Sequence, residues 1–119
     1  MSEKQMTAAE FRAIRAGLGV TAEWIADHIG VRTRAVQRWE SGDSGIKPGV
    51  ADAILMLEAE AAGQVADHVA AMAGHPTPVL AIEDDGSSET WPSGWQRQIA
   101  FRVRQQVPGV RIVDVDRVS

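Results

Sequence analysis

The chain has 119 residues, of which 45 % are hydrophobic and 24 % charged, and this is the composition of one small globular domain with or without an appendage. It contains no cysteine, which excludes disulfides and thiolate metal sites, and its three histidines lack the spacing of metal ligands. No segment approaches the roughly 20 apolar residues of a membrane span, and the first ten residues lack the apolar core of a secretory signal. We therefore expect a cytoplasmic protein with no metal, no cofactor and no membrane partner.

The formal net charge is −4, but the charge is unevenly distributed along the chain. Residues 1–50 hold seven basic and six acidic side chains, whereas residues 51–119 hold five basic and ten acidic ones. Within the first half, three arginines and a tryptophan fall in the twelve residues VRTRAVQRWESG, positions 31–42. Nucleic-acid binding by such an acidic chain must depend on a local basic patch rather than on the overall charge.

Three short helices are predicted near the N-terminus, over residues 8–17, 22–29 and 33–41. Thr7 and Glu10 have the spacing of a capping box that opens the first helix. Thr21 can cap the second helix, Gly30 can close it, and the third is expected to stop at Gly42. The apolar residues expected to point inward are Phe11, Ile14, Leu18, Ile25, Ala26, Ile29, Ala35, Val36 and Trp39.

A fourth, long helix is predicted to begin at Pro48, since proline is well placed in the first turn of a helix. Its apolar residues recur with helical spacing at positions 50, 54, 57, 61, 65, 69 and 72. The second half is mostly alanine and small apolar residues, so we expect this stripe to be covered by a partner helix. Gly63 is a place where the helix could bend or divide.

The last forty residues predict a strand, a helix and a strand. The segments VLAI, 79–82, and VRIVDV, 110–115, have strand character, and Ser93 with Gln96 has the spacing of a second capping box. A helix from there to about Val107 would make a small parallel β-α-β unit. Two strands alone are marginal, so we expect a second copy of the chain to complete the packing. The predicted dimer interface is Val79, Leu80, Trp95, Ile99, Val103 and Ile112.

The segment 21–42 has the order of a helix-turn-helix, in which the second helix lies in the major groove with its N-terminal residues against base edges. One face of the predicted third helix carries only hydrogen-bonding side chains, because positions three or four apart share a face. An arginine fork matches guanine O6 and N7, and a glutamine amide matches adenine N6 and N7. We therefore predict base contacts from Thr33, Arg34, Gln37 and Arg38, and phosphate contacts from Arg32, Lys47 and Ser41. A solvated helix face is the alternative interpretation of the same arginines.

Residues 7–60 resemble the Cro/C1-type, phage-repressor-like helix-turn-helix family. The matching residues are Thr21, Ile25, Ala26, Gly30, Val31, Val36, Trp39, Glu40 and Gly42. The resemblance implies a lambda-repressor-like helical head and a structural ion pair between Arg15 and Glu40. The chain departs from the family at Ala22, where a phosphate-contacting glutamine is usual, and at Trp24, where a polar residue is usual. We expect Trp24 to pack on a neighbour, such as the fourth helix.

The whole chain also resembles the anti-CRISPR-associated autoregulators and their YdiL-like relatives, through GWQRQIAFRVRQQ between two short strands. This resemblance implies a DNA-binding domain over 1–60, and over 61–119 the rest of the long helix followed by a β-α-β dimerisation region. The fold class expected is mainly α with a small α+β tail.

The expected function is sequence-specific regulation of transcription, as a homodimeric autorepressor on an inverted-repeat operator. An antitoxin that neutralises a toxin through its C-terminal unit and an RNA-binding regulator are the alternatives. No catalytic arrangement is present in the sequence, so an enzyme is not expected.

Overall fold

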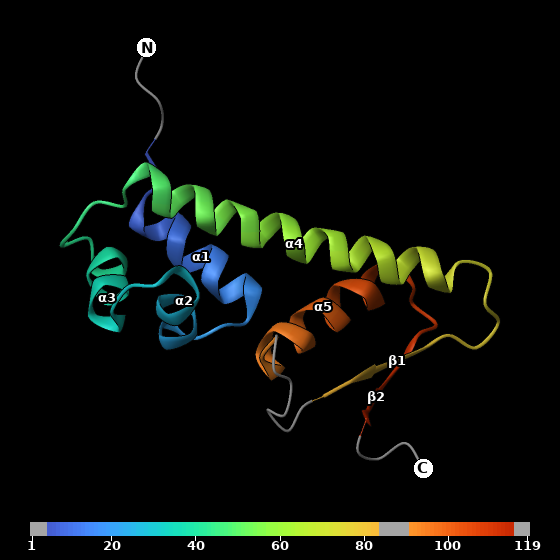
Figure 1. Ribbon diagram of the computed structural model, residues 1–119. Helices are drawn as coiled ribbons and strands as arrows, with labels where there is room; N and C mark the ends of the chain where they lie inside the picture. Colours follow the sequence, from blue (N-terminus) through green and yellow to red (C-terminus); the bar gives the residue numbers. More distant parts are fainter. Residues whose placement is uncertain (1–4, 84–90, 116–119) are drawn as a thin grey trace. The chain divides into compact units, whose positions relative to one another are not determined.

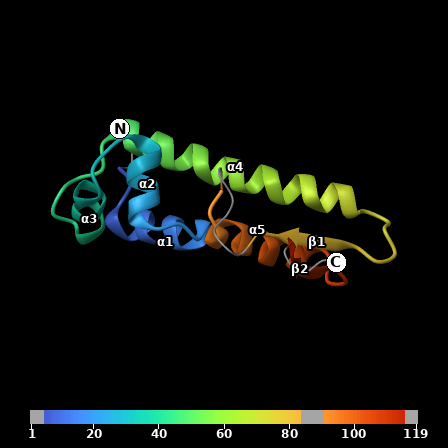
Figure 2. The same ribbon diagram turned by 60° about the horizontal axis from the view of Figure 1, so that its bottom comes forward.

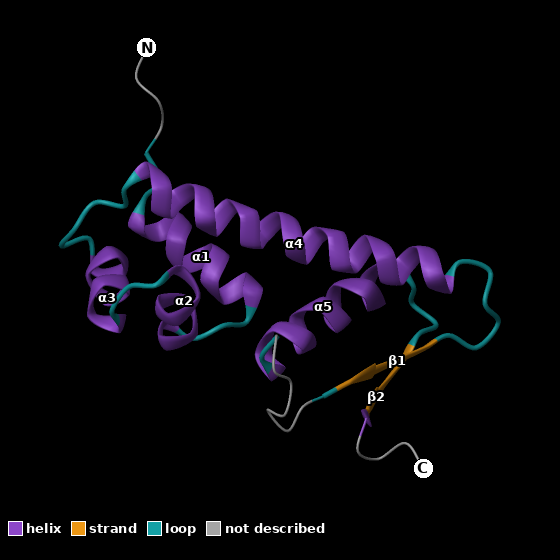
Figure 3. Cartoon of the chain, viewed as in Figure 1, coloured by secondary structure: helices purple, strands orange, loops and turns teal. Residues whose placement is uncertain are grey.

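The computed structural model describes residues 5–83 and 91–115, and within these ranges it holds five helices and a two-stranded parallel sheet (Figures 1 and 3). The chain forms two compact units, Met1–Ala59 and Glu60–Ser119. The mainly helical fold with a small strand-containing tail is the predicted class. In the described ranges no helix combines the length and apolar character required to cross a membrane.

The first unit contains α1 (Ala8–Leu18), α2 (Ala22–Ile29), α3 (Thr33–Ser41) and the beginning of α4 (Pro48–Met72). The predicted caps are present: the Thr7 hydroxyl accepts from the Glu10 amide, and the Glu10 carboxylate accepts from the Thr7 amide. At the start of α2, the Thr21 hydroxyl accepts from the amide of Trp24 at 3.0 Å. Helices α1, α2 and α3 each end at a glycine with positive φ, a conformation that would strain a residue with a side chain. These glycines are Gly19, Gly30 and Gly42. The core of this unit is Phe11, Leu18, Val20, Ile25, Ala26, Val36, Trp39, Ile46, Ile54 and Leu57.

Helix α4 is continuous over 25 residues and is not divided at Gly63. All seven positions of the predicted apolar stripe are buried or half-buried, with Ile54, Leu57, Ala61 and Val65 the most enclosed. In the second unit, α5 (Ser93–Gln106) lies along the C-terminal half of α4 in both views (Figures 1 and 2), and a hydrogen bond from Trp95 Nε1 to Gln64 Oε1 joins them at 2.9 Å. The expectation of a separate partner helix is therefore wrong for this stretch, because α5 of the same chain covers it.

The second unit also contains β1 (Val79–Ile82) and β2 (Arg111–Asp114), which pair in parallel with Val79 opposite Arg111. This is the predicted β-α-β unit. Leu80 and Ile82 are buried with Trp95, Ile99, Ala100, Val103 and Val110. The predicted second capping box is absent, because the N-cap residue of α5 is Pro92 and no side chain caps its first turn.

Candidate nucleic-acid interface

Helix α3 is fixed on the first unit by its apolar underside. Val36 is fully buried, and the buried Trp39 ring meets the Phe11 ring of α1 edge to face, with centroids 5.8 Å apart and planes at 68°. Ala35 is half-buried beside them. Because these residues occupy one side of a nine-residue helix, the other side of α3 is left toward solvent.

The outward side of α3 carries the predicted base-contacting residues. Arg34, Gln37 and Arg38 are exposed, and Thr33 is half-buried at the N-terminus of the helix. Among the residues that the structure describes, neither Arg34 nor Arg38 has a salt-bridge partner. The three side chains can therefore present their hydrogen-bond donors to a ligand without first breaking an ion pair.

The single acidic residue of α3 is turned away from this surface and neutralised. Glu40 is half-buried, and both of its carboxylate oxygens are held by Arg15 of α1, one by Nε and the other by Nη2 at 3.0 Å. This is the ion pair that the resemblance implied. Arg15 Nη1 also donates to the carbonyl of Val20 at 3.1 Å, so the guanidinium ties together α1, the turn after it and α3. Arg34 and Arg38 are therefore accompanied by no unpaired acidic side chain of α3 itself.

The predicted phosphate contacts differ in what they can offer. Arg32 precedes α3 and Lys47 follows it in the loop before α4. Both side chains are exposed, and neither has a salt-bridge partner among the described residues, so their cationic groups are suited to phosphate. Ser41 is exposed too, but its hydroxyl donates to the carbonyl of Arg38 at 3.1 Å and accepts from the Asp43 amide at 3.4 Å. With its one proton used inside the helix, Ser41 presents no donor to phosphate in this conformation.

Most of the predicted dimer interface is wrong. Leu80, Trp95, Ile99 and Val103 are buried in the core of their own second unit, where the sheet packs against α5, and they are not available to another chain. Only Val79, 55 % exposed, and Ile112, 36 % exposed, lie at the surface. Sequence reasoning missed two further exposed apolar residues, Phe101 on α5 and Val115 after β2. Phe101 follows the buried Ala100 and lies on the opposite side of the helix from Ile99 and Val103, so helical spacing could have found it.

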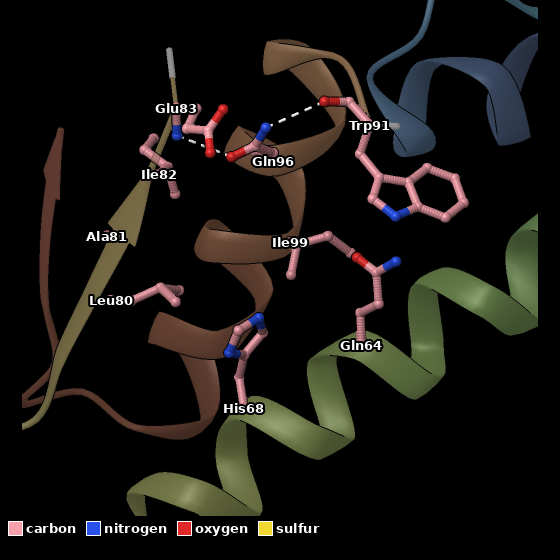
Figure 4. Close-up of a pocket in the computed structure, with 9 residues that line it drawn as sticks. All are labelled: Gln64, His68, Leu80, Ala81, Ile82, Glu83, Trp91, Gln96 and Ile99. Atoms are coloured by element: carbon pink, nitrogen blue, oxygen red, sulfur yellow. Dashed lines mark hydrogen bonds between the residues drawn. The ribbon is translucent and has the colours of Figure 1, made fainter. Parts of the chain in front are cut away.

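A pocket of about 240 Å³ lies inside the second unit (Figure 4). Gln96 lines it and makes two bonds: its Oε1 accepts from the Glu83 amide at 2.8 Å, and its Nε2 donates to the Trp91 carbonyl at 3.0 Å. Gln96 thus ties the end of β1 to the start of α5, in place of the predicted cap. No group of three or more metal-ligating side chains occurs within the described ranges.

The tryptophans serve as packing residues. Trp91 and Trp95 stack with centroids 4.3 Å apart and planes at 15°, which fixes the first turn of α5. Trp24 stacks in the same manner on His28 within α2, at 4.8 Å.

Neither the models of known protein families nor the curated proteins include a match to this chain.

Proposed function

We propose that this protein is a sequence-specific DNA-binding regulator of transcription, an autorepressor that uses α3 as its recognition helix. The observation that carries the proposal is the composition of the outward side of α3: it consists of donor side chains, its two arginines are unpaired among the described residues, and the only carboxylate of the helix is held by Arg15. A merely solvated helix face ordinarily mixes both signs of charge.

The arrangement of α2 and α3 supports the same proposal. The two helices pack against each other and are joined by a short turn at Gly30, whose φ of 78° ends α2. This is the order of a helix-turn-helix, whose second helix enters a major groove about 12 Å wide. The N-terminal residues of α3, Thr33 and Arg34, would then meet base edges.

Specificity would come from the geometry of the donors. The planar forks of Arg34 and Arg38 suit guanine, the amide of Gln37 suits adenine, and Thr33 can offer its methyl or hydroxyl group. Arg32 and Lys47 would hold the phosphate backbone on the two sides of the helix. Because the whole chain is acidic, sequence-independent binding is expected to be weak.

The protein would act as a homodimer, with the second unit as the dimerisation region. A two-stranded sheet is marginal by itself, and the exposed Val79 and the half-buried Val113 share the face of the sheet opposite to Leu80, which a second copy could cover. Two recognition helices about 34 Å apart would bind an inverted repeat with half-sites one helical turn apart.

Selection of binding sites from random duplex DNA with the full chain tests the proposal. A palindrome is expected, and Arg34→Ala or Arg38→Ala should each weaken binding to it by about 1–3 kcal/mol and relax the preference at one base pair. Arg97→Ala, at an exposed arginine of α5, is the matched control and should leave affinity unchanged. Unchanged affinity in both α3 variants would exclude α3 as the recognition helix. Enrichment of RNA alone, or a toxin co-purifying with a chain that selects no DNA, would favour the two alternatives.

A further inference from the structure

A second arginine of α1 also reaches the end of α3. Arg12 Nη1 donates to the backbone carbonyl of Glu40 at 2.6 Å, while Arg15, one helical turn later, holds the carboxylate of the same residue. The last four carbonyls of a helix lack partners within it. In α3 the carbonyl of Trp39 accepts from the Gly42 amide and that of Arg38 from the Ser44 amide, so the carbonyl of Glu40 is the one that Arg12 satisfies.

We infer that Arg12 is a positioning residue for DNA recognition, which acts through α3 without touching DNA; this inference rests on the proposed function. Arg15 holds a side chain that can rotate about its own bonds, whereas Arg12 holds the backbone of α3 itself. A cation at a helix C-terminus is also favoured by the helix dipole. Together the two arginines fix both the rotation and the tilt of α3 on α1.

The length of α3 explains why this contact matters at its other end. Nine residues span roughly 13 Å, so a tilt of about 10° about the C-terminal contact would move Thr33 and Arg34 by about 2 Å. Recognition groups need placement within about 0.5 Å and 10–20° to make their hydrogen bonds. Loss of the Arg12 bond should therefore reduce affinity and blur the preference at the bases nearest the N-terminus of α3.

An exposed arginine could instead contact a phosphate, and the experiment is built to separate the two roles. A phosphate contact contributes about 0.9 to the slope of log affinity against log salt, whereas a contact that only positions α3 contributes nothing to this slope. A phosphate contact would also add independently to the effect of removing Arg34, whereas a positioning contact loses its effect once the positioned group is gone.

The test measures operator affinity of the full chain over a range of salt concentrations, on the palindrome obtained by selection. Arg12→Ala is expected to weaken binding about fivefold with an unchanged salt slope, as for one hydrogen bond of about 1 kcal/mol. Arg12→Lys, which keeps a donor and the charge, should restore most of the affinity and guards against a loss of folding in the alanine variant. The control is Arg104→Ala, which removes a comparable bond, from Arg104 Nη1 to the carbonyl of Val110 at 3.3 Å, in the second unit. It should leave affinity unchanged.

Combining Arg12→Ala with Arg34→Ala completes the test. Removal of the Arg12 side chain should change affinity by less than twofold once Arg34 is absent. A salt slope lower by about 0.9, additive effects in the double variant, or full affinity of Arg12→Ala would each overturn the inference. Failure of the proposed function is distinguishable, since in that case Arg34→Ala and Arg38→Ala would also bind the selected DNA as the parent chain does.

Discussion

The two phenylalanines of the chain show how strongly context decides what one residue type does. Phe11 is fully buried and meets Trp39, so it joins α1 to the underside of α3. Phe101 is 55 % exposed on α5. Phe11 therefore supports the candidate interface, whereas Phe101 takes no part in the core of the second unit.

Phe11→Ala is expected to lower the free energy of unfolding by about 3–5 kcal/mol, because it removes a buried ring and leaves a cavity. Phe101→Ala is the matched control and should cost less than about 1 kcal/mol in a chain kept monomeric by dilution. Urea denaturation followed by tryptophan fluorescence measures both changes. Equal costs for the two substitutions would contradict the placement of Phe11 in the core.

At the scale of the element, glycine has opposite roles at the end of α3 and within α4. Gly42 has a φ of 84° and ends α3, a conformation that strains any residue with a Cβ. Gly63 is exposed in the middle of α4 in ordinary helical geometry, and a Cβ placed there would meet no atom within 4 Å. Gly63 therefore weakens α4 without providing a turn.

Gly63→Ala should stabilise the protein by about 0.5–1 kcal/mol, since alanine has the higher helix propensity and nothing obstructs its methyl group. Gly42→Ala should destabilise it by about 1 kcal/mol or more, because φ at this position is positive. Thermal unfolding of the two variants beside the parent chain checks the opposite signs. A destabilising Gly63→Ala would mean that α4 bends or is contacted at that residue in solution.

At the scale of the whole molecule, the exposed apolar residues of the second unit are the feature that favours binding of a second copy of the chain. Val79 of β1 and Val113 of β2 share the face of the sheet opposite to Leu80, and each side chain is left partly in water. Burying such a surface in a second copy would link two recognition helices and give an inverted-repeat site its affinity.

Val79→Glu combined with Val113→Glu is expected to convert the proposed dimer to monomers at micromolar concentration, because a carboxylate buried without a partner is strongly disfavoured. Sedimentation velocity measures the change, and binding to the full palindrome should fall toward that of a single half-site. A double variant that stays dimeric would place the interface elsewhere, for instance on the exposed Leu55 and Met56 of α4.

The sequence by itself determined where the helices and strands lie, and the ends of the first three helices to within one residue, because these depend on contacts between residues close along the chain. The threonine caps, the terminating glycines and Pro48 act within one helical turn, and the spacing of apolar residues showed which side of each helix is buried. The pairing of Arg15 with Glu40 came from the resemblance rather than from spacing.

Only the tertiary structure decided which element covers each apolar side. Spacing marks Ile99, Val103 and the α4 stripe as buried, but it does not say whether the cover is the same chain or a second one, and here α4, α5 and the sheet cover one another. The bond from Arg12 to the Glu40 carbonyl could not be predicted from the sequence either. Every residue has a backbone carbonyl, so the pattern of side chains does not indicate which carbonyl, here one 28 residues away, accepts the bond. Contacts distant in sequence depend on how the elements pack, and packing is a property of the folded chain.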